Sequence, residues 1–208
     1  STGLDNSTIT GDYTIGIKSE WLSLVGDVFG RYISGIAGDY LFHSVPYYSM
    51  SEEDLELEEF NKLGEQASQG CVRLAVSDAK WVYDNCPTGT NVSIYDDAEN
   101  AGPLGKPDAI KITDFTNKWD PTDSNKKCPY AKATPIISGA NDYTIKSGGE
   151  FYALAGVTAV DTCGNDITPN IEVFGNVVTT RKGKYKVTSS VTDVLKRTSS
   201  VTIMVTVQ

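Results

Sequence analysis

Residues 68–74 read Ser68-Gln69-Gly70-Cys71-Val72-Arg73-Leu74, with a cysteine placed between a glycine and the start of an apolar run. His43 is the only histidine among the 208 residues. A cysteine becomes a good nucleophile when a neighbouring base or positive charge favours the thiolate, and imidazole is the side chain that titrates near neutral pH. If one pair of side chains in this chain performs covalent chemistry, the sequence favours Cys71 with His43.

The residues around this pair indicate supporting roles. Ser44 follows the histidine, and its side chain or its carbonyl can hold the imidazole in the tautomer that accepts a thiol proton. Gly70 lacks a Cβ, so the backbone N–H groups at Gly70 and Cys71 can approach an oxyanion. Arg73 lies on the same side of an extended segment as Cys71, where it can favour the thiolate or bind a carboxylate. The ordinary alternative is that Cys71 and His43 are packing residues and that Arg73 forms a structural ion pair.

Composition limits the classes of function. An apolar content of 39% in 208 residues is enough for one large domain or two smaller ones. The net charge of −9 and the absence of a basic stripe argue against nucleic-acid binding. No apolar run approaches the roughly 18 to 20 residues of a membrane span. The chain opens on Ser1-Thr2-Gly3 without Met, so the absence of a signal segment decides nothing.

The cysteines do not have the spacing of a metal site. There are four of them, with no C-x-x-C pair and no second histidine, so we expect neither a metal nor a cofactor. If Cys71 stays a thiol, at most one disulfide can form among the other three. Whether Cys86 and Cys128 are bridged is left open by the sequence, as is the state of Cys163.

A change in composition near residue 130 predicts two modules. The first is mixed, with strands expected at 13–17, 40–42 and 91–95. Its first helix is predicted over 51–66, where acidic residues crowd the first turn and apolar residues recur every three positions. Six of the eight residues in 52–59 are acidic, which favours a solvated surface helix; the sharper alternative is a lid beside the reactive pair.

A second helix is predicted from Ser77, as its N-cap, to the residue before Pro87. Trp81 within it is expected in the core. Residues 98–132 are rich in Pro, Gly, Asp, Asn and Lys and are predicted to form a tail or linker, although Phe115 and Trp119 indicate that part of it packs back on the first module.

From residue 134 onward, strand-like runs alternate with turn signals. Val201, Ile203, Val205 and Val207 alternate with polar or unbranched residues. Short strands at this spacing over about 75 residues predict a β-sandwich. No constellation of residues in this module indicates chemistry.

Several segments of the first module carry a resemblance to a known family. They are Ser1-Thr2-Gly3, Gly11-Asp12-Tyr13, Phe42-His43-Ser44-Val45-Pro46, the run 63–74, Asp78-Ala79-Lys80-Trp81-Val82-Tyr83-Asp84 and Gly89-Thr90-Asn91-Val92. In order and identity they resemble the opening region, the His-Ser segment, the Ser-His-Gly-Cys nucleophile motif, the following helix and the closing Gly-Thr strand of the L,D-transpeptidase catalytic domain.

This resemblance implies a mainly β fold, with a β-rich catalytic domain carrying short helices over 1–128 and an immunoglobulin-like β-sandwich over 133–208. The second assignment rests on three segments that look like a bacterial immunoglobulin-like surface module: Gly156-Val157-Thr158-Ala159-Val160-Asp161, Asn165-Asp166-Ile167-Thr168 and 183–193. Such modules commonly position a catalytic domain in the cell wall. We therefore expect an extracellular location, in the wall or at the outer face of the cytoplasmic membrane.

The resemblance also implies a role for each candidate residue. Cys71 would attack the carbonyl of an L-residue that precedes a D-residue in a donor stem peptide of peptidoglycan, and an amine of an acceptor stem would take the acyl group. His43 would be the base, Ser44 its orienting neighbour, and the amides of Gly70 and Cys71 the oxyanion donors. The expected substrate-binding residues are Ser68, Gln69, Arg73 and Tyr47, the last matching an aromatic near the donor site.

The chain departs from the family pattern in two places. Gln69 stands where the family usually has histidine, so His43 is left as the candidate base. The family normally has one or two β-strands before the Ser-Thr-Gly segment, so we expect the first strands to be lacking and a sheet edge to be exposed.

Three functions fit these residues. The leading one is a transpeptidase that cross-links stem peptides as a monomer and is open to carbapenem inhibitors. The second is an L,D-carboxypeptidase that uses water as the acceptor. The third is a non-catalytic wall-binding or structural protein with a truncated transpeptidase module.

Overall fold

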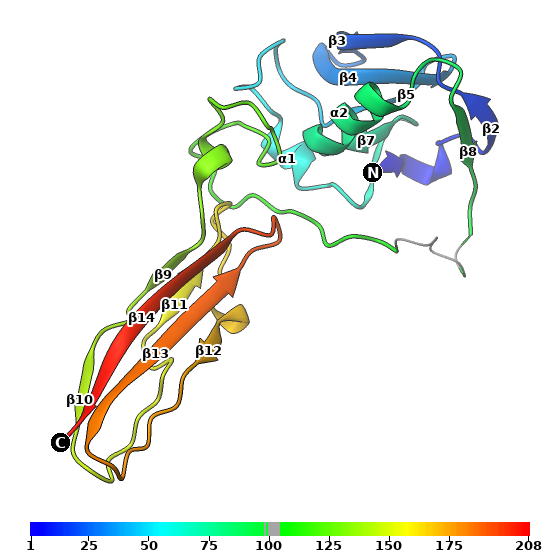
Figure 1. Ribbon diagram of the computed structural model, residues 1–208. Helices are drawn as coiled ribbons and strands as arrows, with labels where there is room; N and C mark the ends of the chain where they lie inside the picture. Colours follow the sequence, from blue (N-terminus) through cyan, green and yellow to red (C-terminus); the bar gives the residue numbers. More distant parts are fainter. Residues whose placement is uncertain (98, 100–104) are drawn as a thin grey trace. The chain divides into compact units, whose positions relative to one another are not determined.

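The computed structural model describes residues 1–97, 99 and 105–208, so residues 98 and 100–104 of the predicted linker lie outside the described residues. The chain divides into two compact units, Ser1–Ala131 and Lys132–Gln208 (Figure 1). The sequence predicts this boundary between residues 128 and 133. Strands dominate both units, which confirms the prediction of a mainly β protein.

The first unit is built on a four-stranded sheet in the order β3-β4-β5-β7. Neighbouring strands are antiparallel except β5 and β7, which are parallel. The strands are β3 (Lys18–Leu24), β4 (Val28–Ala37), β5 (Tyr40–Ser44) and β7 (Val72–Leu74). The turn from β3 to β4 places Gly26 and Asp27 at positive φ, 95° and 57°, which these residue types tolerate better than most.

Two small strand pairs flank this sheet. β1 (Thr2–Gly3) runs parallel to β6 (Gln66–Ser68), and β2 (Gly11–Thr14) runs antiparallel to β8 (Asn91–Ile94). A 3₁₀ turn, η1 (Leu4–Asn6), follows β1. The predicted strand at the end of the first module therefore forms, and the pairing of β1 with β6 brings the opening residues beside the segment that leads to Cys71.

The predicted helix over 51–66 is wrong. Only α1 (Leu57–Phe60) is helical, Leu55 forms a bridge to Tyr47, and Gln66 begins β6. Like charges three and four residues apart disfavour a long helix in this acidic run, and Glu56 at the N-cap makes no side-chain cap. Leu57 and Phe60 are buried, so this segment is part of the core and is neither a solvated helix nor a helical lid.

The second predicted helix is confirmed as α2 (Val76–Asn85), but its cap differs. Ser77 lies inside the helix, and the first N–H groups are satisfied from a distant segment. The Val76 N–H donates to Asp120 Oδ2 at 2.8 Å, and the Ser77 N–H donates to Thr122 Oγ1 at 3.1 Å. Trp81, expected in the core, is 62% exposed, because it lies on the outer face of the helix.

Residues beyond 105 complete the core of the first unit. Ile110 and Ile112 join a cluster formed by Val45, Tyr47, Leu55, Leu57, Phe60 and Ala75. Trp119 is also buried, as predicted, whereas Phe115 is 52% exposed and the prediction for it was wrong. The segment 105–131 is therefore an integral part of the first unit.

The second unit consists of two sheets. One has the order β10-β14-β13-β12 and the other pairs β9 with β11. The strands are β9 (Ile136–Ser138), β10 (Tyr143–Ile145), β11 (Thr158–Val160), β12 (Glu172–Phe174), β13 (Gly183–Thr192) and β14 (Thr198–Val207), with 3₁₀ turns η2 (Pro129–Lys132) at the unit boundary and η3 (Thr168–Asn170). Ile203, Val205 and Val207 are buried in alternation, as the sequence pattern predicts.

Candidate functional site

The parallel pairing of β5 with β7 brings the two candidate reactive residues to one cleft. His43 lies on β5 opposite Arg73 of β7, and Cys71 directly precedes β7. Both line a cleft of about 490 Å³, together with Ser68, Gln69 and Gly70. One strand pairing thus brings residues 28 positions apart to the same cleft, which spacing alone does not reveal.

His43 is 2% exposed, and its Nδ1 lies 2.6 Å from the Ser44 carbonyl oxygen. A carbonyl only accepts hydrogen bonds, so the imidazole donates through Nδ1 and keeps the Nε2 lone pair. Burial lowers the pKa of His43 to about 4, and the charge of Arg73 acts in the same direction. At neutral pH the imidazole is therefore an uncharged base in the tautomer that accepts a proton at Nε2.

Ser44 orients this imidazole through its carbonyl. Its hydroxyl donates to the Val45 carbonyl at 2.7 Å and accepts the Arg31 N–H at 2.9 Å. The side chain is fully buried and does not line the cleft. Of the two ways in which Ser44 was expected to act, the main-chain one matches the contacts.

Cys71 is half-buried, and its Sγ lies 3.5 Å from the Asp39 carbonyl oxygen. Burial raises the pKa of this thiol above its ordinary value, although the Leu41 main chain and the charge of Arg73 act in the opposite direction. A raised thiol pKa and a lowered imidazole pKa together mean that the resting pair is a neutral thiol and a neutral imidazole, not an ion pair.

The turn before Cys71 is closed by Ser68. Its hydroxyl accepts the Gly70 N–H at 3.0 Å and donates to the Cys71 carbonyl at 2.6 Å. Gly70 has φ of 138°, and a Cβ there would lie 2.6 Å from a ring carbon of Tyr40. Glycine is therefore required at this position, while Ser68 is 2% exposed and Gln69 is exposed to solvent.

Arg73 lines the cleft but is already paired. Its Nη1 lies 2.5 Å from Glu59 Oε2, and its side chain is 17% exposed. Nε is buried without a hydrogen-bond partner in the described part of the chain. Arg73 therefore forms the structural ion pair that was the ordinary alternative to a role in binding. Its Nε–H remains a buried donor that a ligand could use.

Tyr47 does not lie at the cleft, which corrects its assignment as a substrate-binding residue. It is fully buried in the core, where its ring packs edge-on against Trp21 at 5.2 Å between centroids. A side chain without exposed surface cannot contact a substrate. The aromatic residue that lines the cleft is Tyr40.

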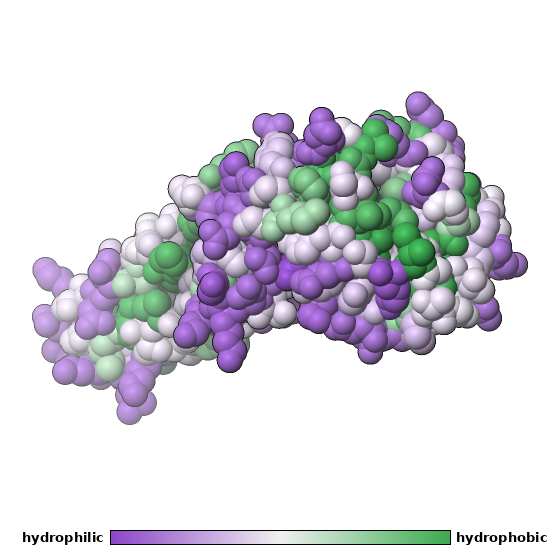
Figure 2. Space-filling view, turned by 90° about the horizontal axis from the view of Figure 1, so that it is seen from above, coloured by the Kyte–Doolittle hydropathy of each residue, from purple (hydrophilic) through white to green (hydrophobic). Residues whose placement is uncertain are grey.

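The site also contains an apolar wall and a glycine that the sequence did not indicate. The wall comes from the β3–β4 hairpin, and Val25 at its turn is 78% exposed. Seen from above, Figure 2 shows apolar surface over the region where β3 and β4 lie in Figure 1. Gly30 lies against the imidazole, because a Cβ there would lie 3.2 Å from His43 Nδ1. A glycine inside a strand is the signal that marks such a close approach.

The described residues contain no group of three or more His, Cys, Asp or Glu side chains placed to hold a metal ion. None of the four cysteines, all of them among the described residues, forms a disulfide, so Cys86 and Cys128 are not bridged. Among the described residues, no helix is both long enough and apolar enough for a membrane span.

Comparison with known proteins matches two family models to the two units. Residues 1–94 match the L,D-transpeptidase catalytic domain, and residues 135–207 match the Ig-like domain of bacterial surface proteins. A curated relative, the putative L,D-transpeptidase YciB of Bacillus subtilis (strain 168), is 49% identical over 57 residues, which is 27% of this chain and 28% of the relative. The chain thus spans about a quarter of that relative's length.

Among solved structures, a fused Zn-dependent amidase/peptidase/peptidoglycan-binding domain-containing protein from Clostridium acetobutylicum ATCC 824 is 35% identical over 46% of this chain and 38% of that one, with a TM-score of 0.34. The LD transpeptidase LdtMt1, solved in complex with imipenem, is 18% identical over 46% of each chain, with a TM-score of 0.36.

Proposed function

We propose, from the match of residues 1–94 to the L,D-transpeptidase catalytic domain, that the chain is a cysteine-dependent acyltransferase that cross-links peptidoglycan stem peptides. The Cys71 thiol attacks the carbonyl of an L-residue followed by a D-residue in a donor stem. The terminal D-amino acid leaves, and an amine of an acceptor stem takes the acyl group from the sulfur. The reaction takes place outside the cytoplasmic membrane, where the Ig-like domain positions the catalytic domain in the wall.

The observation that carries this proposal is that Cys71 and His43 line one cleft, with the imidazole held through Nδ1. His43 Nε2 takes the thiol proton as sulfur attacks, and later gives it to the leaving amine. Because both groups are neutral at rest, proton transfer accompanies attack. Acylation therefore keeps its base down to about pH 4, the pKa of the buried imidazole.

The loop 68–71 and Arg73 shape the rest of the site. The Cys71 amide stabilises the oxyanion of the tetrahedral intermediate, and the Gly70 amide joins it when substrate displaces the Ser68 hydroxyl that it now contacts. Gln69 is exposed at the cleft and contacts the stem peptide. Arg73 binds a stem carboxylate in competition with Glu59.

Mass spectrometry after incubation with imipenem, and separately with a tetrapeptide-stem muropeptide, tests the proposal. We expect one covalent adduct, located on Cys71. Cys71→Ala abolishes it, whereas Cys86→Ala, at the other half-buried cysteine, leaves it unchanged. A folded wild-type protein that forms no adduct with either compound contradicts the proposal.

The products distinguish the acceptor. With muropeptide as the substrate, cross-linked dimers identify an amine acceptor and a transpeptidase. Stems that are only shortened by their terminal D-amino acid identify water as the acceptor and an L,D-carboxypeptidase. Chromatography with mass detection separates the two products from one reaction mixture.

A further inference from the structure

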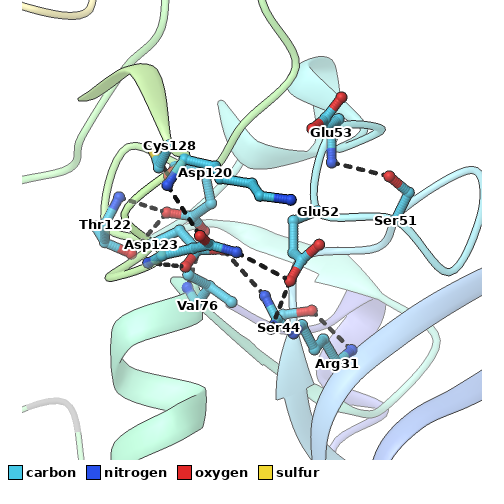
Figure 3. Close-up of polar contacts among 12 residues, drawn as sticks. Arg31, Ser44, Ser51, Glu52, Glu53, Val76, Asp120, Thr122, Asp123 and Cys128 are labelled. Carbon is cyan, nitrogen blue, oxygen red and sulfur yellow. Dashed lines mark hydrogen bonds and ion pairs between the residues drawn. The ribbon is translucent and has the colours of Figure 1, made fainter. Parts of the chain in front are cut away.

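Arg31 is a buried cation on β4, the strand that pairs with β5, which carries His43. It is 5% exposed and is surrounded by three carboxylates. Nη1 contacts Asp123 Oδ2 at 3.0 Å, and Nη2 contacts Glu52 at 3.0 Å and Glu20 at 3.6 Å. Figure 3 shows Glu52 and Asp123 directed at this guanidinium. A buried charge is tolerated only where such partners compensate it, so its position is set by theirs.

Asp123 is the most buried of these partners, and it comes from outside the 1–94 family match. Its side chain is 5% exposed. Its Oδ1 accepts the Asn125 N–H at 2.8 Å, and its own N–H donates to the Asp120 carbonyl at 3.0 Å. Asp120 in turn caps α2 through Val76 (Figure 3). The carboxylate that meets Arg31 is thus held rigidly by the segment that also begins α2.

Next to Arg31 the backbone is irregular. Tyr32 has φ of 54°, a left-handed conformation that costs free energy for a residue with a large side chain. The pairing of β4 with β5 ends at Ser34 opposite Phe42. The Arg31 guanidinium lies 4.6 Å from the centroid of the Tyr32 ring, within the range of a cation–π contact that helps to offset this cost.

Where the regular pairing of β4 with β5 ends, a side chain of β5 takes over one main-chain hydrogen bond. The Arg31 N–H donates to the Ser44 hydroxyl at 2.9 Å instead of to a main-chain carbonyl of β5. The same serine presents its carbonyl to His43 Nδ1 at 2.6 Å. A continuous series of contacts therefore runs from the Asp123 carboxylate through Arg31 and Ser44 to the imidazole.

The geometry points to Arg31 and Asp123 as positioning residues for His43, which they hold in the Nδ1–H tautomer through Ser44. The expected effect of this role on acylation rests on the proposed function. Its expected effect on the imidazole tautomer does not. Neither residue lines the cleft. The segment beyond the family match thereby controls the base of the site within it.

Asp123→Asn in the full chain tests this role, with Glu20→Gln as the matched control. Both substitutions remove one negative charge facing the same guanidinium, but Glu20 is 60% exposed and lies 3.6 Å away. Because His43 is the only histidine, ¹⁵N spectra of the imidazole report its tautomer without ambiguity. We expect one Nδ1–H tautomer in wild type and Glu20→Gln, and a mixture with Nε2–H in Asp123→Asn.

Imipenem acylation gives the second readout. In Asp123→Asn the maximal acylation rate falls about 10- to 100-fold, as for a displaced catalytic group, while the concentration for half-maximal rate is unchanged. Glu20→Gln stays within about twofold of wild type, as expected for an exposed ion pair. A role limited to stability would lower the melting temperature and leave both the tautomer and the rate of the folded protein unchanged, and that result overturns the inference.

Failure of Asp123→Asn to fold and failure of wild type to be acylated each have a defined interpretation. If Asp123→Asn does not fold, Ser44→Ala interrupts the same series without touching the buried ion pair, and a single unchanged Nδ1–H tautomer in it contradicts the inference. If wild type is not acylated at all, the proposed function fails, whereas a tautomer change in Asp123→Asn still supports the positioning role.

Discussion

The two units of this chain differ in how their backbones are held. In the second unit β13 and β14 pair over ten residues each without a register shift, and buried valines and isoleucines alternate along them. In the first unit the pairings of β1 with β6 and of β4 with β5 shift register, and four non-glycine residues adopt positive φ: Asp5, Asn6, Asp27 and Tyr32. In the second unit one non-glycine residue does so, Lys196 in the turn between β13 and β14. Regular alternation specifies a sheet by itself, whereas irregular backbone needs buried polar partners.

The unit with the irregular backbone is also the one that contains the proposed active site. The first unit carries the cleft, the buried histidine and the buried arginine with its carboxylates. Strain and buried charge lower stability, and they persist where they orient reacting groups. We therefore expect changes in the first unit to alter acylation, and matched changes in the second unit to alter stability alone.

The largest effect is expected from His43→Gln, which removes the general base. Imipenem acylation falls by about 10²- to 10⁴-fold, the usual contribution of a positioned base, and the rest of the fold is retained. The matched change is Asp193→Asn in the second unit. Asp193 is 4% exposed and accepts the Arg197 N–H at 2.8 Å, so its loss lowers the melting temperature. Stopped-flow acylation and calorimetry measure both.

These two variants test whether catalysis and stability divide between the two units. Undiminished acylation in His43→Gln removes the histidine from the mechanism. Slowed acylation in folded Asp193→Asn shows that the second unit acts on the chemistry and that the division between the units is not functional.

The next largest effect is the change of folding stability with pH, which has opposite signs for His43 in the first unit and Cys163 in the second. Burial lowers the pKa of His43 from 6.5 to about 4, so the unfolded chain binds a proton first, and stability is lost as pH falls from 6.5 to 4. At 1.36 kcal/mol per pH unit, this is about 3 kcal/mol. Burial raises the pKa of Cys163 to about 12, so the second unit loses stability as pH rises from 9 to 12.

Within the first unit, the pH dependence of stability that comes from Asp120 opposes the one that comes from His43. A variant is therefore needed to separate the two contributions. Burial raises its pKa from 3.8 to about 6, and its contribution is lost as pH rises through that range. The comparison of wild type with His43→Gln between pH 4 and 7, by denaturant unfolding, isolates the histidine. Parallel curves for the two proteins contradict the assignment, and Cys163→Ala provides the corresponding comparison above pH 9.

The sequence predicted the second unit better than the first, for a physical reason. The alternation from Val201 to Val207 reports a buried face directly, because side chains of a strand alternate with period two. In the first unit the acidic run 52–59 resembles a helix start, yet only Leu57–Phe60 is helical, since Leu55 pairs with Tyr47. Long-range partners decided the local structure there.

The candidate site shows the same limit. Cys71 and His43 were identified by residue type and by resemblance, and the parallel pairing of β5 with β7 then explains how they share a cleft. Tyr47 was misplaced because position relative to the histidine does not reveal which side of the sheet a side chain occupies. Arg31 and Asp123 are 92 residues apart, and no local pattern connects them.

A smaller effect is expected from two glycines, one in each unit. A Cβ at Gly30 would lie 2.9 Å from Ile33 Cδ1 and 3.2 Å from His43 Nδ1, so Gly30→Ala displaces the imidazole. We expect acylation to fall about tenfold and the free energy of unfolding to fall by about 1–3 kcal/mol. A Cβ at Gly139, which has φ of 81°, would lie 2.1 Å from the Gly156 carbonyl oxygen. Gly139→Ala is therefore destabilising by a similar amount but leaves acylation unchanged, and slowed acylation in it contradicts the separation of roles.

The smallest effects come from two fully buried core side chains, Val205 and Tyr47. Val205→Ala opens a cavity in a largely apolar cluster and lowers the free energy of unfolding by about 2 kcal/mol. Tyr47→Phe removes a hydroxyl that has no hydrogen-bond partner among the described residues, so it leaves this free energy unchanged or raises it by up to about 1 kcal/mol. Urea unfolding of both variants measures the contrast. A loss in Tyr47→Phe as large as that in Val205→Ala would mean that the hydroxyl is bonded and that the core of the first unit depends on it.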